Sequence, residues 1–100
     1  MENCCEDKVK YKKTPRTKED VSKLKNRLSR IQGQIEGVKK MLDEGRYCGD
    51  VLIQTSAIKK AVEAVSYEIL KEHLSTCVAE EIKNDNLAII NETIDVIKKI

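Results

Sequence analysis

Apolar side chains recur every three or four residues between positions 21 and 42, and this pattern constrains the fold more than any other feature. The series comprises Val21, Leu24, Leu28, Ile31, Ile35, Val38 and Leu42. Alternating spacings of three and four residues are typical of a helix that packs lengthwise against other helices. Thr17, followed by two acidic residues, is typical of a helix start. Gly45 is typical of a helix end.

Two further apolar series predict a second and a third helix. The second series comprises Val51, Thr55, Ile58, Val62, Val65 and Ile69. It predicts a long helix from near Asp50 to about Val78 or Ile82. The polar residues 84–86 interrupt the pattern, and a short third helix follows. That helix is marked by Leu87, Ile90, Ile94 and Ile97.

The expected fold class is all-α, with a protomer of two long antiparallel helices and a short third one. Four glycines and one proline leave little material for the turns of an all-β fold. A chain of 100 residues with 3% aromatic residues buries only a modest core. Pairing two hairpins into an antiparallel four-helix bundle would cover the apolar stripes. We expect residues 1–16 to form a disordered, charged tail and residues 17–100 to form the helical domain.

The cysteine content and the lack of apolar runs bear on the compartment. No stretch approaches 18 consecutive apolar residues, and the N-terminal residues are charged, so we expect neither a membrane span nor a secretory signal. The predicted compartment is the cytoplasm, where thiols stay reduced. The four cysteines are then ligands, redox centres or core residues rather than disulfides.

The charge is unevenly distributed, although the formal net charge is only +2. Residues 8–30 contain ten Lys or Arg against two acidic residues, a local charge of +8. Such a segment favours an anionic partner. The chain contains no nucleophile–base–orienter set and no phosphate-binding loop, so we expect neither an enzyme nor an organic cofactor.

Three soft donors, Cys48, His73 and Cys77, form the candidate metal site. His73 and Cys77 lie four residues apart and share one face of a helix. Cys48 precedes His73 by 25 residues, about 37 Å along a helix that rises 1.5 Å per residue. One chain cannot bring all three to a single ion, whereas two chains packed antiparallel along this helix can. The spacing therefore predicts a site shared between subunits.

The identity of the metal, and metal binding itself, remain open from spacing alone. Two thiolates and an imidazole select copper(I), or zinc when a fourth ligand is present. Alternatively, free cysteines are often small buried hydrophobic residues, and a single histidine on a helix is often a hydrogen-bonded core residue.

Three separated motifs resemble the copper-sensitive operon repressor family over about residues 20–99. Residues 26–37, NRLSRIQGQIEG, resemble its first-helix signature. Residues 46–52, RYCGDVL, resemble the start of its second helix, and residues 72–77, EHLSTC, resemble its closing motif. The resemblance implies an all-α dimer that assembles into a homotetramer. It also implies that Cys48 of one subunit binds copper(I) together with His73 and Cys77 of the neighbour.

The resemblance assigns further roles. Tyr47 and Glu92 match positions that surround the histidine, where a partner on the free ring N–H fixes the orientation of a ligating imidazole. Nickel and cobalt sensors of the family use more nitrogen ligands, persulfide sensors lack the histidine, and formaldehyde sensors lack a cysteine at the position of Cys77. Copper(I) is therefore the expected metal. Cys4 and Cys5 are possible accessory metal ligands, or incidental thiols.

The expected function is a repressor that binds operator DNA without metal, releases it on binding copper(I), and so derepresses copper-efflux genes. Lys23, Arg27 and Arg30 share one helix face. The expected DNA-binding set comprises Lys12, Lys13, Arg16, Lys23, Arg27, Arg30, Lys59 and Lys60. The alternative is a repressor that senses thiol oxidation or persulfides through Cys48 and Cys77.

Overall fold

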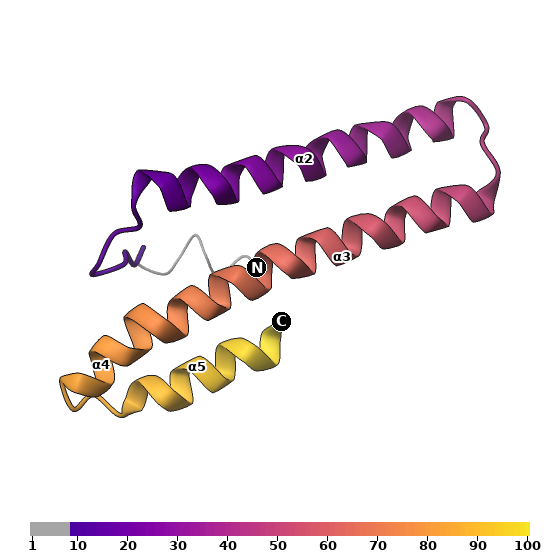
Figure 1. Ribbon diagram of the computed structural model, residues 1–100. Coiled ribbons are helices and arrows are strands. Elements are labelled where there is room, and N and C mark those ends of the chain that lie inside the picture. Colours follow the sequence, from indigo (N-terminus) through magenta and orange to yellow (C-terminus); the bar gives the residue numbers. More distant parts are fainter. Residues whose placement is uncertain (1–8) are drawn as a thin grey trace. The chain divides into compact units, whose positions relative to one another are not determined.

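The computed structural model describes residues 9–100, which are helical apart from the N-terminal segment and short connections (Figure 1). Helix α2 spans Lys18–Asp43 and α3 spans Cys48–His73. The π-helix η1 (Leu74–Val78) and the short α4 (Ala79–Lys83) follow directly, and α5 spans Ala88–Lys99. The described part of the chain contains no strand. The predicted all-α class and the three helical segments are confirmed.

The start and end of α2 follow the sequence signals closely. The Thr17 hydroxyl accepts a hydrogen bond from the backbone N–H of Asp20 at 3.1 Å, which caps the first turn. At the other end, Gly45 has a φ of +66°, a left-handed conformation that glycine adopts without steric cost. The backbone N–H of Arg46 bonds to the carbonyl of Met41 at 3.0 Å and closes the helix.

The second helix starts two residues earlier than the sequence suggested. The backbone N–H groups of Asp50 and Val51 bond to the carbonyl of Tyr47, so the first turn already contains Cys48. The helical run then continues without a break through α3, η1 and α4 to Lys83, as predicted for a long second helix. Asp85, with a φ of +61°, reverses the chain into α5.

The chain divides into two compact units, Arg16–Glu72 and a second unit made of the residues up to Pro15 and His73–Ile100. We call the first the hairpin unit and the second, of which residues 9–15 and 73–100 are described, the C-terminal unit. The predicted division into a tail (1–16) and a helical domain (17–100) stays a prediction.

The hairpin unit consists of α2 and α3, which lie antiparallel (Figure 1). Ile31 of α2 and Val65 of α3 are buried and line one small depression between the helices. Leu24 and Val38, seven residues to either side of Ile31, are half-buried. The other members of the α2 seam, also seven residues apart, are exposed. They are Val21, Leu28, Ile35 and Leu42, with exposed fractions of 39%, 46%, 44% and 63%.

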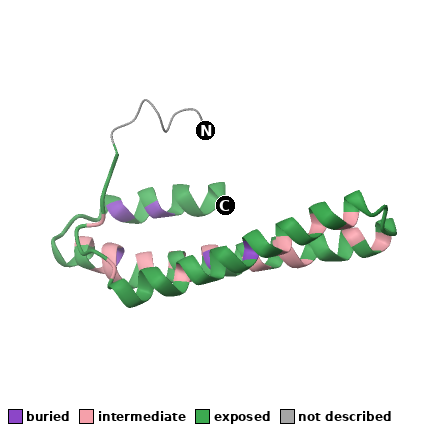
Figure 2. Cartoon of the chain, turned by 90° about the horizontal axis from the view of Figure 1, so that it is seen from above, coloured by how far each residue is buried: buried purple, intermediate pink, exposed green. Residues whose placement is uncertain are grey.

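The same division recurs on α3. Val51 and Ile58 are half-buried and Val65 is buried, again at intervals of seven residues. Thr55, Val62 and Ile69 are exposed. Figure 2 accordingly shows most residues of the described chain as exposed and few positions on either long helix as buried. One half of each apolar seam therefore holds the hairpin together, and the other half has no cover within the described chain.

The C-terminal unit has its own small core. Val78 of η1 and Ile89 and Thr93 of α5 are buried. Helix η1 contacts both α4 and α5. Within residues 9–100, no helix combines the length and apolar character that a membrane crossing requires.

Candidate metal centre and basic surface

His73 and Cys77 line one cavity of about 290 Å³ in the C-terminal unit. His73 is the last residue of α3, and Cys77 lies in η1. Helix α5 contributes Ile89 and Glu92 to the same cavity, and residues 10–14 of the N-terminal segment line it as well. The structure thus brings together two of the three predicted metal ligands and Glu92, one of the two residues expected around the histidine.

The π-helical turn changes how the two donors are aligned. In an α-helix of 3.6 residues per turn, a residue four positions on lies somewhat beyond a full turn. A π-helix, with its i→i+5 hydrogen bonds, holds more residues per turn. Because η1 follows His73 directly, the angular offset between His73 and Cys77 around the helix axis differs from that of a regular α-helix. Such turns are often found at functional sites, and the periodicity of the sequence gave no sign of this one.

The sulfur of Cys77 already has hydrogen-bonding neighbours. Lys12 Nζ lies 3.1 Å from Cys77 Sγ and 3.2 Å from Thr76 Oγ1, and it donates to both. The Thr76 hydroxyl lies 3.6 Å from the same sulfur. Cys77 is a half-buried free thiol, and His73 is also half-buried. The contact with Lys12 was not expected from the sequence, which placed this lysine only in the DNA-binding set.

A second contact holds the N-terminal segment beside the cavity. The ammonium group of Lys13 forms a short ion pair with Glu81 Oε1. The side-chain amide of Asn86 donates to Glu81 Oε2 at 2.7 Å. The hydrogen bond from Lys13 lowers the pKa of Glu81 below its ordinary value, and the amide of Asn86 adds to this effect. The same ion pair raises the pKa of Lys13.

Cys48 and Tyr47 lie at the start of α3, in the hairpin unit. Cys48 is an exposed free thiol, and 74% of the Tyr47 side chain is exposed. The Tyr47 ring lies against Gly49, where an added Cβ would come within 2.6 Å of the ring edge. The glycine of the RYCGD motif therefore leaves room for the tyrosine beside the exposed thiol.

The described residues of one chain do not bring the full ligand set together. Within residues 9–100, no group of three His, Cys, Asp or Glu side chains is placed to hold a metal ion. Cys48 is not among the residues that line the cavity of His73 and Cys77. Cys4 and Cys5, the possible accessory ligands, lie outside the described residues.

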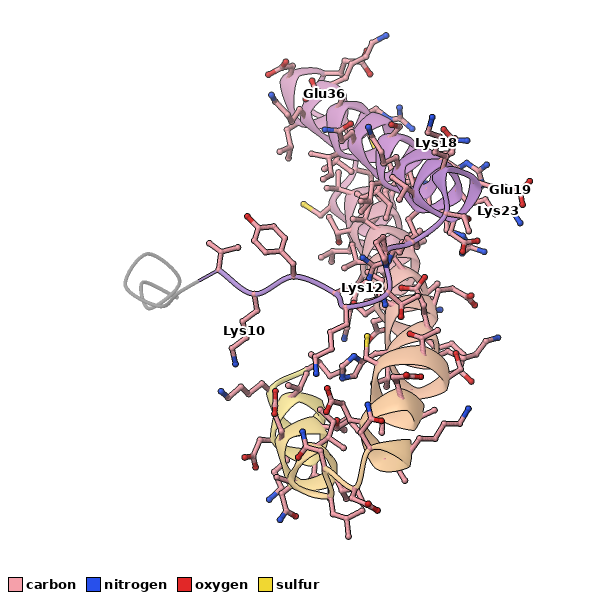
Figure 3. All side chains as sticks on the ribbon, turned by 90° about the vertical axis from the view of Figure 1, so that its left-hand side faces the viewer. Lys10, Lys12, Lys18, Glu19, Lys23 and Glu36 are labelled. Atoms are coloured by element: carbon pink, nitrogen blue, oxygen red, sulfur yellow. The ribbon has the colours of Figure 1, made fainter. Side chains whose placement is uncertain are left out.

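The basic residues predicted to bind DNA lie mainly on exposed positions of the two long helices. Lys23, Arg27 and Arg30 are exposed on α2, and within the described chain no acidic side chain pairs with them. Arg27 and Arg30 border the depression that contains Ile31 and Val65. Lys59 and Lys60 are exposed on α3. Figure 3 shows Lys23 extending outward from its helix.

The remaining members of the predicted DNA-binding set have other partners. Lys12 and Lys13 contact Cys77 and Glu81, as described above. Arg16 Nε lies 2.5 Å from Glu72 Oε1, and both side chains are half-buried. A second basic depression near the start of α2 was not predicted. It is lined by Arg16, Lys18, Val21, Ser22, Lys25, Asn26 and Ser29.

The all-helical fold and the paired thiol and imidazole define a helical protein with a candidate site for a soft metal ion. Residues 20–99 match the family model described as "Metal-sensitive transcriptional repressor". The chain belongs to this family. Its members are transcriptional repressors, which act on DNA, rather than enzymes.

Individual relatives agree with this assignment. The chain is 39% identical over 100 residues to the copper-sensing transcriptional repressor CsoR of Bacillus subtilis (strain 168), covering 99% of this chain and 96% of the relative. It is similar, with a TM-score of 0.85 and 40% identity, to the crystal structure of the copper-sensing repressor CsoR with Cu(I) from Geobacillus thermodenitrificans NG80-2. That match covers 92% of this chain and 97% of the other. The resemblance to the copper-sensitive operon repressor family is thereby confirmed.

A further similarity concerns a different metal. The nickel-responsive transcriptional regulator InrS matches with a TM-score of 0.67 and 38% identity, over 82% of this chain and 97% of the other. The fold is thus shared by relatives described as copper-sensing and as nickel-responsive. The fold alone therefore does not identify the metal, and its identity has to be inferred from the residues of the site.

Proposed function

We propose that this metal-sensitive repressor responds to copper(I), binding operator DNA in its metal-free form and releasing it when copper binds. Cys48 of the partner subunit, together with His73 and Cys77, would hold the ion. The observation that carries the proposal is that α3 begins at Cys48 and ends at His73, with Cys77 following on the same helical run. The donors at its two ends are about 37 Å apart at 1.5 Å per residue. Two copies lying antiparallel would bring Cys48 of one copy close to His73 and Cys77 of the other.

The chemistry of the donors favours copper(I) over nickel. Two thiolates and one imidazole are soft ligands, which suit a monovalent ion of low coordination number. Nickel favours more nitrogen ligands, and this chain has one histidine. Two relatives that match over more than nine tenths of this chain, from Bacillus subtilis and Geobacillus thermodenitrificans, are described as copper-sensing.

Glu92 and Tyr47 are proposed to support the histidine. Glu92 lines the same cavity as His73, from α5, and its carboxylate could accept the ring N–H that does not face the metal. Tyr47 precedes Cys48, so in the antiparallel pair it would reach the histidine of the partner. Fixing the imidazole in this way would keep the ligating nitrogen aimed at the ion.

The exposed halves of the apolar seams support assembly with a second copy. On α2 and on α3, apolar side chains spaced seven residues apart face away from the hairpin core. A second hairpin would cover them and form an antiparallel four-helix bundle. Pairing of two such dimers gives the proposed homotetramer. Binding to operator DNA places the protein in the cytoplasm, where the site thiols stay reduced.

The DNA-binding surface is proposed to centre on Lys23, Arg27 and Arg30, with Lys59 and Lys60. These cations are exposed, so they are available to backbone phosphates, and affinity should fall steeply with salt. Lys12, Lys13 and Arg16 belong to the same proposed set but have contacts within the chain, so we expect smaller contributions from them.

Copper binding that favours the DNA-free assembly must weaken DNA binding, and DNA must weaken copper binding by the same factor. The genes released from repression would be those for copper efflux.

A mixing experiment tests the shared site directly. Neither Cys48→Ala nor the double variant His73→Ala, Cys77→Ala should bind copper(I) at this site alone. After the two are unfolded together and refolded, half of the dimers carry one chain of each kind, and each of these has one intact site. Copper(I) binding should therefore recover to about one quarter of the wild-type sites, because a two-fold dimer has two equivalent sites. X-ray absorption would identify the sulfur and nitrogen donors.

The controls separate this result from general rescue by refolding. Each variant refolded alone should stay without a site, and wild-type protein treated in the same way should keep all of its sites. Full-strength copper(I) binding by Cys48→Ala, or no recovery in the mixture, would rule out the shared site. Release of operator DNA on copper(I) addition completes the test.

A second candidate function, sensing of persulfides or thiol oxidation, is favoured by one contact. Cys77 lies against the ammonium of Lys12, and reactive cysteines occupy electropositive, partly exposed surroundings. In this case an intersubunit disulfide or polysulfide would join Cys48 of one subunit to Cys77 of its neighbour, with the added persulfide or other oxidant accepting the electrons. If operator DNA stays bound at one copper(I) per subunit but is released by persulfide treatment, this function replaces the first.

A further inference from the structure

The depression near the start of α2 belongs to the hairpin unit and shares no lining residue with the candidate metal centre. Its volume is about 500 Å³, within the range of roughly 300–1,000 Å³ that is usual for ligand sites. Three cations, Arg16, Lys18 and Lys25, line it, whereas the acidic residues of the first turn, Glu19 and Asp20, do not. A hollow of this kind favours a negatively charged occupant. We call it the basic depression.

The other polar side chains of the basic depression can donate neutral hydrogen bonds. They belong to Ser22, Asn26 and Ser29. The two lysines and the two serines, at positions 18, 22, 25 and 29, share one face of α2 because they lie four, three and four residues apart. All four are exposed, and within the described chain no acidic side chain pairs with either lysine.

This set of donors suits a phosphate group. A phosphate has several charged acceptor oxygens, and hydrogen bonds with ionised partners are about twice as strong as neutral ones. The guanidinium of Arg16 has several N–H donors, so its contact with Glu72 through Nε leaves others for an anion. Among the described residues that line the depression, only Val21 is apolar, so an apolar ligand would find few contacts.

The basic depression also faces a different side of α2 from the predicted DNA-binding residues. Arg27 follows Lys18 by nine residues, about two and a half helical turns, and the two side chains therefore leave opposite sides of the helix. Lys25 precedes Arg27 by two residues, a rotation of about 200°. A straight duplex seated on Arg27 would leave the basic depression available for a separate phosphate group.

We propose that the basic depression is a phosphate-binding site, distinct from the DNA-binding face that contains Arg27. Lys18 and Lys25 supply the charge, and Arg16 and the serines supply further donors. The phosphate group comes either from a free phosphorylated anion or from nucleic acid that bends around α2. The site itself does not depend on the response to copper(I), and only the second source rests on the proposed function.

The first test is an NMR titration of the full-length, metal-free protein with inorganic phosphate at constant ionic strength. Backbone amides of residues 16–29 should shift and saturate. The double variant Lys18→Gln, Lys25→Gln should bind phosphate about tenfold more weakly or worse, the factor expected for one hydrogen bond between charged groups. The matched control is Lys39→Gln, Lys40→Gln, which removes the same charge from the other end of α2 and should stay within about twofold of wild type.

A variant of unchanged charge separates a specific site from general attraction. Ser22→Leu places an apolar side chain in the depression at an exposed position of α2, where leucine forms helix well. Losing the hydroxyl should weaken phosphate binding by about fivefold, the factor expected for one neutral hydrogen bond. Equal phosphate affinity of Ser22→Leu and wild type would reduce the effect to charge alone and overturn the site.

The salt dependence of DNA binding identifies the source of the phosphate. Each phosphate contact contributes about 0.9 to the slope of log affinity against log salt concentration. If nucleic acid occupies the site, Lys18→Gln, Lys25→Gln should lower the slope for a duplex of the promoter region by about two, and the duplex should displace inorganic phosphate. If a free anion occupies it, the slope should equal that of wild type and phosphate should bind alongside DNA.

The outcomes keep the site and the sensor apart. If neither the phosphate affinity nor the salt slope separates Lys18→Gln, Lys25→Gln from the control Lys39→Gln, Lys40→Gln, the phosphate site is refuted and the copper(I) sensor stands. A wild-type protein that binds phosphate at residues 16–29 but keeps its DNA in the presence of copper(I) would refute the sensor and leave the site in place.

Discussion

The two units of the chain differ in how many residues they bury for their length of helix. The hairpin unit has two helices of 26 residues each, yet only Ile31 and Val65 are buried in it. The C-terminal unit has far less helix, yet it buries Val78, Ile89 and Thr93 and has further contacts from residues 9–15. Both units expose apolar side chains, but only the C-terminal unit contains the cavity of His73 and Cys77. The longer helices therefore do not bury the larger core.

The largest expected effect comes from the exposed seam of the hairpin unit. Leu28→Glu combined with Ile35→Glu places two charges on the uncovered apolar face of α2. Burying each such side chain contributes about 1.5–3 kcal/mol, so the assembly should dissociate and the helices should lose much of their stability. Sedimentation velocity and far-ultraviolet circular dichroism would measure both.

The control for this change is Ser29→Glu, which adds a charge at an exposed position of the same helix, off the apolar seam. It should leave the sedimentation coefficient unchanged. A double variant that sediments and melts like the wild type would show that the exposed seam needs no partner.

The C-terminal unit should respond next most strongly, through its own core. Ile89→Ala removes a buried side chain from α5 and should lower the free energy of unfolding by about 2–4 kcal/mol. Ile90→Ala, one residue along and 42% exposed, should cost less than about 1 kcal/mol in a single chain. Urea denaturation gives both values. If Ile90→Ala costs as much as Ile89→Ala, the exposed face of α5 is also covered in the assembled protein.

Two threonines, one in each unit, provide a further comparison. The Thr93 hydroxyl is buried without a hydrogen-bonding partner in the described structure, so Thr93→Val should raise the free energy of unfolding by about 1 kcal/mol. The exposed Thr55 hydroxyl donates to the carbonyl of Leu52 at 2.9 Å. Thr55→Val should therefore change the stability by less than about 0.5 kcal/mol. Destabilisation by Thr93→Val would mean that this hydroxyl has a partner in the assembled protein.

The smallest effect concerns the ion pair of Lys13 with Glu81, which holds the N-terminal segment 9–15 against α4. The pKa of Glu81 is lowered, so the contribution of the pair is present above the ordinary value of 4.5 and is lost as the pH falls below it. The pKa of Lys13 is raised, so the contribution holds up to 10.5 and is lost at higher pH. Amide relaxation of residues 9–15 should show greater mobility once the pH falls through the lowered pKa of Glu81, and Glu81→Gln should abolish this pH dependence. Equal mobility of these residues at neutral pH and in acid would show that Lys13 does not anchor the segment.

The sequence was sufficient to predict the helices because their signals are local. The heptad spacing of the seams, the cap at Thr17 and the glycine at position 45 each act within a few residues. The pairing of His73 with Cys77 was predictable for the same reason, since it depends on one turn of helix. The roles of these residues in binding metal and of the basic residues in binding DNA stay predictions.

Other parts of the site depend on contacts that no local pattern encodes. The contact of Lys12 with Cys77 joins residues 65 positions apart, and Lys12 and Lys13 were assigned to DNA because the sequence shows only their charge. The π-helical turn at residues 74–78 was missed because apolar periodicity does not distinguish it from an α-helix. The start of α3 was placed two residues late because the turn at Tyr47 is stabilised by backbone hydrogen bonds rather than by a side-chain cap.

Each apolar seam is divided into alternate residues that face the hairpin core and residues that are exposed. This division makes the response of the sensor depend on the concentration of the protein. If the outward set is buried only between copies, folding and the completion of each metal site follow mass action, and both weaken on dilution. A cell that makes very little of such a protein would then have fewer working sites per chain than one that makes more. The threshold for its response would be set by gene dosage as well as by ligand chemistry.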